Sequence, residues 1–314
     1  MIIELSSAAE FLKNNNNFLI LTHGHPDGDT LGCGLALKEA LASIGKTCRV
    51  CCGDPVPEKF GYMGQMDSDD FIPDKIVAVD VADTKLLSKA FEEKYADKVD
   101  LCIDHHGSNR MYAKSTLLDS NAAAACEIIL QLIRALDVEI TKSIADCIYT
   151  GLITDTGCFR YSNVTPRTMR MAADMIEAGA ENARINTVMF ETKTKTYVAL
   201  ERLALDGMKM YFDDKCAFIT ITQEMFHKTG SDESEVDAIA ALPRQIEGVV
   251  VGITMREKPD GTFKVSMRSG ESADVSEICA TMGGGGHPRA AGCTVDGGVE
   301  NATQTVLENV KKFI

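Results

Sequence analysis

Residues 18–33 of this 314-residue chain indicate its fold class. They read Phe-Leu-Ile-Leu-Thr-His-Gly-His-Pro-Asp-Gly-Asp-Thr-Leu-Gly-Cys. The first five residues of this stretch form an apolar run of the length of a short buried strand. Residues 29–42 then repeat leucines on overlapping helical faces, and Gly45 follows as a stop signal. A buried strand that leads directly into a helix is typical of a parallel α/β sheet.

The same alternation continues to about residue 180. Further strands are predicted over residues 47–52, 75–81 and 99–103, and further helices over 84–95, 122–136, 141–154 and 165–179. Asp119, Ser120 and Asn121 are the expected N-cap residues of the helix that starts at residue 122. The sequence therefore predicts an α/β domain with a parallel sheet over residues 1–186.

The rest of the chain predicts a second, smaller α/β domain over residues 201–314. Residues 187–200 lack a clear core pattern, so we expect them to link the two domains. Beyond them, strands are predicted over residues 208–212, 216–221, 248–255 and 263–268, and helices over 231–242, 274–282 and 301–313. A run of four glycines, Gly283 to Gly286, leads into His287.

The composition is that of an ordinary globular protein, with 45% apolar and 25% charged residues. No apolar run approaches the roughly 18 residues of a membrane span, and the N-terminus lacks the basic region of a signal peptide. We therefore expect a cytoplasmic protein that binds no membrane. The net charge of −14 argues against binding of duplex DNA, which needs a basic face. A short nucleotide held by metal ions and a few arginines remains compatible with it.

The chain contains eleven cysteines, and one cluster of them, Cys48, Cys51 and Cys52, includes a pair with CxxC spacing. This pair falls in a predicted strand, where residues three apart point to opposite faces. No second Cys or His pair completes a zinc site. We expect most of the cysteines to be buried cytosolic thiols.

Asp and His residues gather where several predicted elements end. They are His23, Asp27 and Asp29 after the first strand, Asp80 in the third, Asp104, His105 and His106 at the end of the fourth, and Asp155 at the end of the helix over 141–154. Ligands of open parallel sheets bind outside the carboxyl ends of the strands. We therefore expect these side chains to meet at one edge of the sheet.

Four carboxylates packed together cannot all ionise without a compensating positive charge. No Lys or Arg lies within these motifs, so two bound divalent ions are the simplest source of that charge. Carboxylate and imidazole ligands suit Mn²⁺, Mg²⁺ or Fe²⁺. Two such ions can stabilise both the entering and the leaving oxygen of a phosphoryl displacement. We expect Asp80 to be the carboxylate that they share.

Each of these residues also has a purely structural interpretation. Asp27 and Asp29 could be turn and N-cap residues, Asp80 could be a polar strand end, and Asp155 could belong to a helix-terminal turn. The hypothesis of a metal site depends on their joint placement at successive element ends.

Taken together, the motifs resemble those of the DHH phosphoesterase superfamily. They are His-x-His-Pro-Asp-Gly-Asp from residue 23, Val-Asp at 79–80, Asp-His-His at 104–106, Thr-Asp-Thr-Gly at 154–157, and Gly-Gly-Gly-Gly-His from residue 283 followed by Ala-Ala-Gly at 290–292. The last of these resembles the signature of the associated DHHA1 domain. The subgroup that the chain resembles is that of the stand-alone nanoRNases and pAp phosphatases, also described as bifunctional oligoribonucleases.

This resemblance implies an α/β catalytic domain, a smaller α/β substrate domain and a cleft between them. It implies Mn²⁺-dependent hydrolysis of very short RNA to mononucleotides and of 3′-phosphoadenosine 5′-phosphate (pAp) to AMP, with a homodimer as one option for the assembly. By position, it assigns His23, Asp27 and Asp80 to one metal, and Asp29, Asp80, His105 and Asp155 to the other.

The resemblance also implies roles for residues that bind no metal. Asp104 would fix the orientation of a histidine, and His106 would stabilise charge on the phosphate. The expected substrate contacts are Arg268, Gly284, Gly285, Gly286, His287 and, with weaker support, Arg160, while Phe159 or Tyr161 could stack on a base. Cys33 and Cys158 depart from the usual motifs and put thiols near the site.

Three other functions remain open at this point. The first is hydrolysis of linear or cyclic dinucleotides in signalling turnover. The second is that of a family II inorganic pyrophosphatase, a group with a different C-terminal domain. The third is a nucleotide sensor that binds without cutting, which the complete set of six ligands disfavours.

Overall fold

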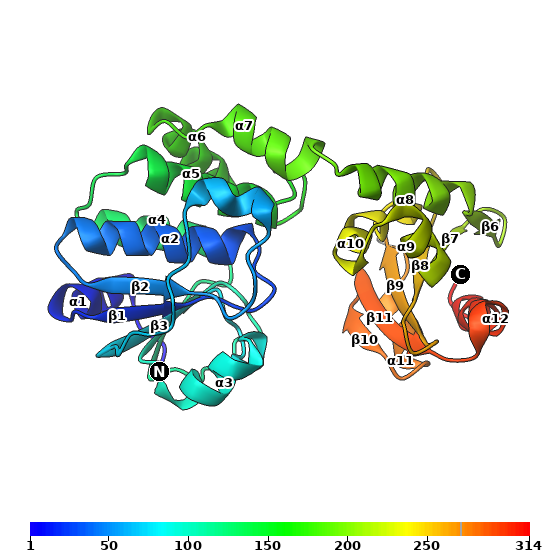
Figure 1. Ribbon diagram of the computed structural model, residues 1–314, viewed down its shortest axis with the longest axis horizontal. Coiled ribbons are helices and arrows are strands. Elements are labelled where there is room, and N and C mark those ends of the chain that lie inside the picture. The colour runs from blue at the N-terminus through cyan, green and yellow to red at the C-terminus, as the bar shows by residue number, and fades with distance from the viewer. Residues whose placement is uncertain (271) are drawn as a thin grey trace. The chain divides into compact units, whose positions relative to one another are not determined.

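The computed structural model describes residues 1–270 and 272–314 and divides the chain into two compact units, Met1–Thr192 and Lys193–Ile314 (Figure 1). The residues that we expect to link two domains, 187–200, are mostly helical. Thr187–Glu191 forms a π-helical turn, and Lys195–Asp206 forms the helix α8. Among the described residues, no helix has the length and apolar character needed to cross a membrane.

The first unit is built on a five-stranded parallel sheet in the order β2-β1-β3-β4-β5. The strands are β1 Phe18–Leu21, β2 Cys48–Cys51, β3 Lys75–Val79, β4 Leu101–Asp104 and β5 Ser115–Leu118. From β1 the chain moves first to β2 on one side and then to β3 on the other. The strand order therefore reverses between β1 and β3, which is where open α/β sheets form their ligand sites.

Helices cover both faces of this sheet (Figure 1). One face carries α1 Leu5–Asn14, α2 Gly28–Ser43 and α4 Ala125–Ala135, with α5 Lys142–Asp155 packed on α2 and α4, and α6 Pro166–Glu177 on α5. The other face carries α3 Lys89–Tyr95. The short elements η1 Glu58–Met63, η2 Thr84–Leu86, η3 Ala96–Lys98 and α7 Asn182–Asn186 complete the unit. The predicted α/β fold with a parallel sheet is confirmed.

The helix predicted from residue 122 starts later than expected, and Asp119, Ser120 and Asn121 do not cap it. Its N-cap position is Ala124, whose side chain cannot accept a hydrogen bond. The carboxylate of Asp29, from a distant part of the chain, instead accepts hydrogen bonds from the N–H groups of Ala125 at 2.6 Å and Cys126 at 2.9 Å. A tertiary contact thus replaces the local cap.

Two other expectations differ in detail. The third strand ends at Val79, so Asp80 lies just beyond it, with a left-handed φ of 57°. The helix predicted over residues 84–95 is two segments, η2 and α3, separated by the extended residues Leu87 and Ser88. The first difference lies at the end of β3, and the second lies in the connection between β3 and β4.

The second unit contains a mixed six-stranded sheet in the order β10-β11-β9-β8-β7-β6, which confirms the smaller α/β domain. Its strands are β6 Lys209–Tyr211, β7 Cys216–Ile221, β8 Val251–Glu257, β9 Phe263–Ser269, β10 Gly285–His287 and β11 Ala290–Val295. One face packs on α11 Val275–Ala280 and α12 Gly298–Val310. On the other face, α8, α9 Gln223–Thr229 and α10 Val236–Ile239 pack on β7.

The glycine run and the region after α9 also differ from expectation. The end of the run is not an open loop, because Gly285–His287 pairs with β11 as an edge strand. The helix predicted over residues 231–242 consists of two short pieces, η5 Glu233–Glu235 and α10, followed by η6 Pro243–Gln245. All eleven cysteines are free thiols, and eight of them are buried, as expected.

Candidate active site

The loop between β1 and α2 holds two of the predicted site residues, His23 and Asp27, and Asp29 follows in the first turn of α2. Asp27 is the N-cap of α2, and its Oδ1 accepts from the N–H groups of Asp29 at 3.0 Å and Thr30 at 3.1 Å. His23 Nδ1 lies 2.7 Å from the carbonyl oxygen of Gly24, and since a carbonyl only accepts, Nδ1 carries a proton. His23 Nε2 then faces Asp27 at 3.6 Å. The structural and the functional interpretation of Asp27 are therefore compatible.

Asp80 lies at the centre of the site, at the reversal point of the sheet. Its Oδ2 is 3.5 Å from His23 Nε2, whereas its Oδ1 is 3.6 Å from His105 Nε2 and 3.5 Å from His106 Nδ1. The side chain is 3% exposed. The two oxygens of one buried carboxylate thus face two different groups of side chains.

The end of β4 organises the two histidines. Asp104 is fully buried, and its Oδ1 accepts from the N–H of His105 and from both N–H and Nδ1 of His106, the last at 2.8 Å. Its Oδ2 accepts from Asn109 Nδ2 at 2.6 Å. Burial opposes ionisation of Asp104, but the hydrogen bonds from His106 and Asn109 outweigh it and lower its pKa. The hydrogen bond to Asp104 in turn raises the pKa of His106.

His105 points into the site from the same turn. Its Nδ1 lies 3.2 Å from the carbonyl oxygen of Ala122, so this nitrogen donates, and Nε2 faces three carboxylates. These are Asp155 at 3.3 Å, Asp80 at 3.6 Å and Asp29 at 3.9 Å. Asp155 is the last residue of α5, and Asp29 is in the first turn of α2. Four sequence-distant segments therefore meet at one point.

The structure brings all six predicted metal ligands together in two groups. Ligand atoms of His23, Asp27 and Asp80 lie within 4.8 Å of one another, and so do those of Asp29, His105 and Asp155. Two buried atoms at the centre, Asp80 Oδ1 and His105 Nε2, have no hydrogen-bond partner among the residues that the structure describes. Buried polar atoms without partners are costly, and a cation between these groups would satisfy both. The residues present therefore fit two divalent ions.

The electrostatics of the cluster point the same way. Burial, with the charges of Asp27 and Asp155 added, raises the pKa of Asp80 to about 6 against the hydrogen bond from His23. Burial and the charges of Asp155 and Asp80 raise the pKa of Asp29 well above its usual value. Burial opposes protonation of the two histidines, but their carboxylate neighbours raise the pKa of His23 to about 11 and that of His105 to about 10. Without bound ions, these raised pKa values favour protons on Asp29, His23 and His105, at the positions that two divalent cations would fill.

Two of the predicted substrate contacts of the second unit, Arg268 and His287, lie in one row across its sheet, and Gly285 and Gly286 precede His287 along β10. Arg268 on β9 is in register with Ala290 on β11, and Ala290 is in register with His287 on β10. His287 is exposed and Arg268 is half-buried. Gly284 has no room for a side chain, because an added Cβ would collide with the backbone of Gly292 and Cys293.

Arg160 and the two aromatic candidates follow α5. Arg160 is exposed, and its Nε donates to the carbonyl oxygen of Gly157 at 2.6 Å. Phe159 packs against Tyr149 with ring centroids 6.3 Å apart, and its partly buried ring lies against the core. Tyr161 is 58% exposed and is the aromatic ring of this pair that a base could reach.

Two supporting residues were not predicted from the sequence. Asn109 fixes the second oxygen of Asp104. Thr30 accepts a hydrogen bond from the N–H of His23 at 3.3 Å and donates to the carbonyl oxygen of Val79 at 3.2 Å, which ties the two strand ends together. The sequence signal for Asn109 is its position five residues after Asp104, but an Asn in a loop is more often a turn residue.

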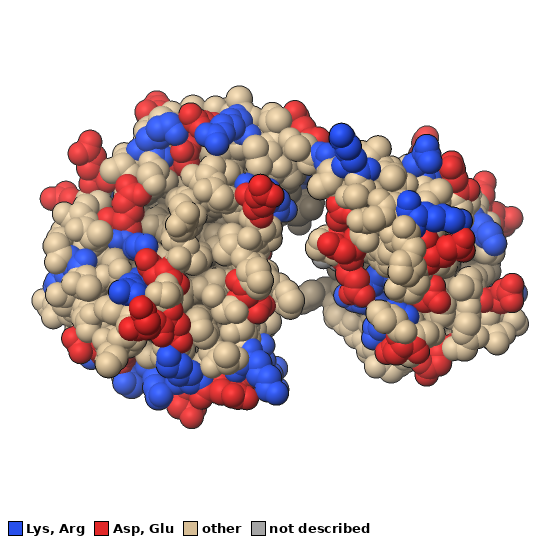
Figure 2. Space-filling view, in the orientation of Figure 1, with Lys and Arg blue, Asp and Glu red and all other residues tan. Residues whose placement is uncertain are grey.

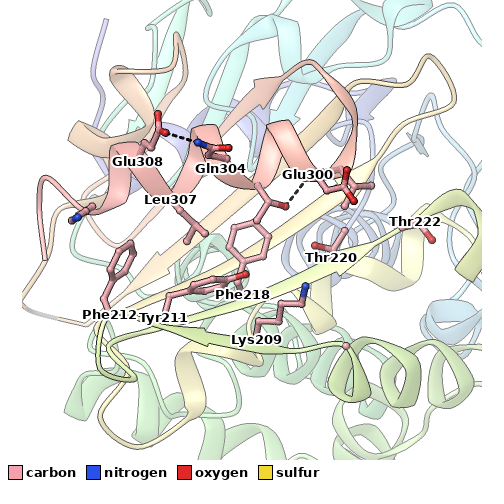
Figure 3. A pocket seen from close by; sticks show the side chains of 14 residues that line it. Lys209, Tyr211, Phe212, Phe218, Thr220, Thr222, Glu300, Gln304, Leu307 and Glu308 are labelled. Atoms are coloured by element: carbon pink, nitrogen blue, oxygen red, sulfur yellow. Dashed lines mark hydrogen bonds between the residues drawn. The ribbon is translucent and has the colours of Figure 1, made fainter.

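A separate cavity of about 660 Å³ lies in the second unit, between α12 and the strands β6 and β7 (Figure 3). Tyr211, Phe218 and Leu307 line it, with Lys209 and Glu300 among the charged residues around them. None of the described groups of potential metal ligands lies there. Those groups all lie in the first unit.

Comparison with known families identifies the class of protein. The sequence matches the DHH family, N-terminal domain, over residues 17–152 and the DHHA1 domain over residues 214–314. It is 31% identical to the bifunctional oligoribonuclease and PAP phosphatase NrnA of Thermus thermophilus, over 97% of this chain and 92% of that protein. The chain therefore belongs to the DHH family and is a DHH-family phosphoesterase.

Solved structures support the fold. An exopolyphosphatase-related protein from Bacteroides fragilis superposes with a TM-score of 0.88 at 24% identity, and covers 98% of this chain and 95% of its own. RecJ from Thermus thermophilus, solved in complex with Mn²⁺, gives a TM-score of 0.60 at 14% identity, over 98% of this chain and 54% of RecJ. At these identities, the likeness concerns the fold alone.

Proposed function

We propose that this chain is a two-metal phosphohydrolase that degrades very short RNA to mononucleotides and dephosphorylates pAp to AMP. The observation that carries the proposal is the position of Asp80, whose two buried oxygens face two separate groups of carboxylate and imidazole ligands. The proposed ligands are His23, Asp27 and Asp80 for one ion, and Asp29, Asp80, His105 and Asp155 for the other. When bound, two divalent ions would supply Lewis acidity and charge neutralisation at the phosphate.

Mn²⁺ is the proposed metal, with Mg²⁺ or Fe²⁺ as alternatives. The donor set supports this choice, since it contains carboxylate and imidazole but no thiolate among the six proposed ligands. The thiol of Cys33 lies 3.7 Å from Asp29 Oδ1 and 3.5 Å from the thiol of Cys126. Burial raises the pKa of both thiols well above the usual value, which disfavours the thiolate that a softer metal would need.

His106 is proposed to stabilise charge on the reacting phosphate. Asp104 holds the proton on its Nδ1 and raises its pKa, so that Nε2 can donate a hydrogen bond to a phosphate oxygen. Asp104 acts through His106 and is a positioning residue. Since its carboxylate is fully buried and fully hydrogen-bonded, it fixes the imidazole without competing for the substrate.

The substrate class rests on the relatives and on charge. NrnA of Thermus thermophilus is described as an oligoribonuclease and PAP phosphatase, and it matches this chain over nearly its whole length. The net charge is −14, and the visible face carries Lys, Arg, Asp and Glu interspersed on each unit (Figure 2). A long RNA would meet net repulsion on such a protein, whereas a short substrate needs only local contacts. Arg268, Arg160, His287 and the glycines 284–286 are the proposed contacts.

A panel of substrates tests the proposal. Purified protein with Mn²⁺ is incubated with 5′-labelled RNA of two to ten nucleotides, pAp, cyclic and linear signalling dinucleotides, and pyrophosphate. We expect the highest kcat/KM on short RNA and turnover of pAp. If the enzyme prefers a signalling dinucleotide, that dinucleotide would replace short RNA and pAp as the proposed substrate, and the proposed two-metal mechanism would still apply. Bound metal without turnover of any substrate would instead support a nucleotide sensor.

A further inference from the structure

The connection that follows α5 turns back toward the proposed metal ligands. Asp155 is the last residue of α5. The turn after it contains three left-handed residues in succession, with φ angles of 55°, 59° and 60° at Gly157, Cys158 and Phe159. Residues other than glycine adopt this conformation only at an energetic cost, so contacts with the rest of the fold must hold the turn. The chain reverses there and brings Asn163 back to the end of α5.

The side-chain amide of Asn163 connects two segments that are distant in the sequence. Its Nδ2 donates to the carbonyl oxygen of Asp155 at 3.1 Å and to that of Ala123 at 3.0 Å. Because carbonyl oxygens only accept, the nitrogen of the amide and not its oxygen must face them. The carbonyl of Asp155 is one of those that the end of a helix leaves without an intrahelical partner, so Asn163 also caps α5.

Ala123 belongs to the connection between β5 and α4, residues 119–124, which supports His105. The carbonyl oxygen of Ala122 accepts from His105 Nδ1 at 3.2 Å. This hydrogen bond keeps the proton on Nδ1, leaves Nε2 free to coordinate a metal and sets the direction of the ring. The position of the β5–α4 connection therefore sets the orientation of a proposed metal ligand.

A second contact holds the start of the β5–α4 connection. Arg167 of α6 donates from Nη1 to Asp119 at 2.9 Å and from Nε to Glu127 at 2.6 Å. Glu127 is fully buried, so removal of Arg167 would leave a buried charge without its partner. Asn163, in contrast, is exposed, and its replacement leaves neither a buried charge nor a cavity. Its contribution can therefore be measured separately from folding.

We propose that Asn163 is a positioning residue that holds Asp155 and His105 in place for one of the two metal ions. This inference rests on the proposed function, in which both side chains bind the same ion. His105 Nε2 and Asp155 Oδ2 are 3.3 Å apart. One amide nitrogen is bonded to the backbone of Asp155 and to the residue next to Ala122, so it fixes the two supports of this pair relative to each other.

The contact acts on one half of the proposed metal site. The other ion is proposed to bind His23, Asp27 and the shared Asp80. His23 and Asp27 lie between β1 and α2, and Asp80 follows β3. The two hydrogen bonds of the Asn163 amide nitrogen go to other segments, the end of α5 and the β5–α4 connection. Loss of this amide should therefore weaken one ion, whereas a general loss of structure would weaken both.

The test is isothermal titration of Mn²⁺ into the unaltered protein, Asn163→Leu and Asn163→Ala. Asn163→Leu keeps a side chain of similar shape without a donor, and neither variant adds a charge. We expect each to weaken one of the two Mn²⁺ sites by roughly 10- to 100-fold, the usual cost of losing a residue that orients metal ligands, and to leave the other within about twofold. The Mn²⁺ concentration that gives half-maximal hydrolysis of short RNA should rise by the same factor.

Ser162→Ala is the matched control, because Ser162 is the exposed neighbour of Asn163. It should change neither Mn²⁺ site. The Tm of each metal-free variant should stay within about 4 °C of the unaltered protein.

Three outcomes would contradict part or all of this inference. Equal weakening of both sites, a larger fall in Tm, or no change in either site would overturn the role of Asn163 and leave the proposed function intact. An unaltered protein that binds two Mn²⁺ ions but hydrolyses neither RNA nor pAp would overturn the proposed function, and the titrations would still decide the role of Asn163. An unaltered protein that binds no Mn²⁺ would overturn both.

Discussion

At the scale of single residues, the proposed two-metal site depends most on Asp80, because no other carboxylate described in the site faces both groups of ligands. We expect Asp80→Asn and Asp80→Ala to lower kcat by at least about 10³-fold, since metal ions contribute several kcal/mol of transition-state stabilisation. Asn tolerates the left-handed φ of 57° at this position, so the first variant tests the charge without backbone strain.

The control for Asp80 is Asp97→Asn, which removes an exposed carboxylate in the same unit. It should leave both turnover and metal content unchanged. Isothermal titration with Mn²⁺ should show fewer bound ions or weaker binding in the Asp80 variants only. Near-normal turnover of purified Asp80→Asn with Mn²⁺ would contradict the proposal that Asp80 is a shared ligand.

The pH dependence of activity provides a second test of single residues, because Asp104 raises the pKa of His106. If protonated His106 is the active form, activity is lost as pH rises through its pKa, which Asp104 raises. Asp104→Asn removes that carboxylate and lowers the pKa of His106, so the alkaline limb of kcat/KM should move to lower pH. Turnover at neutral pH should fall by roughly 10- to 100-fold, the usual cost of losing an orienting partner.

The matched variant is His106→Gln, in which this alkaline limb should disappear. Full pH profiles of kcat/KM for the three proteins separate the outcomes, and Tm measurements show whether each variant folds. An alkaline limb that stays at the same pH in both variants would show that His106 is not the group that titrates.

At the scale of elements, the packing of α5 against α2 and α4 sets the position of Asp29. Gly151 of α5 lies so close to α4 that an added Cβ would collide with Cys126 Sγ and lie 2.7 Å from Asp29 Oδ1. Gly151→Ala should therefore destabilise the fold by about 1–3 kcal/mol, the range for overpacking a core. It should also weaken metal binding, since Asp29 must move.

Gly61→Ala is the control, because nothing lies within 4 Å of its added Cβ. Chemical denaturation with and without Mn²⁺ measures both effects. A Gly151→Ala protein as stable as the parent, with unchanged metal affinity, would mean that the contact between α5 and Asp29 does not position the ligand.

The same elements explain how much of the site could be predicted. Four of the five strands of the first unit follow from hydrophobic periodicity, whereas α1, β5 and α7 were not predicted. Each predicted ligand ends or follows one of the predicted elements. The N-cap of α4 could not be predicted, because Asp29 supplies it from 96 residues away. The strand β10 was missed for a similar reason, since glycines have no strand preference and pairing with β11 alone orders them. The sequence reveals local propensity, whereas both features depend on tertiary contacts.

At the scale of the whole molecule, the buried charges make stability depend on pH and on metal. The pKa of Asp80 is raised to about 6 in the folded state, whereas an Asp in the unfolded chain ionises near pH 4. Without metal, the unfolded state therefore releases this proton first, and the folded state loses stability as pH rises from about 4 to 6. The pKa of His23 is raised to about 11, so its contribution is present below pH 6.5 and is lost as pH rises toward 11. Both effects lower the stability of the metal-free protein with rising pH.

Divalent ions favour the ionised carboxylates and neutral imidazoles, so their stabilising effect should grow with pH. We expect the difference in Tm between Mn²⁺-bound and chelator-treated protein to be larger at pH 8.5 than at pH 5.5. The difference should shrink at both pH values in Asp80→Asn. A difference in Tm that stays constant or falls with pH would show that these groups do not bind the metal.

In the proposed site, side chains from four segments hold two divalent ions around one shared carboxylate. Anomalous diffraction at the manganese edge, from crystals of the unaltered protein grown with Mn²⁺, tests it most directly. We expect two peaks, one contacted by His23, Asp27 and Asp80, and the other by Asp29, Asp80, His105 and Asp155. A single peak that Asp80 does not contact, or manganese bound only elsewhere on the chain, would contradict it.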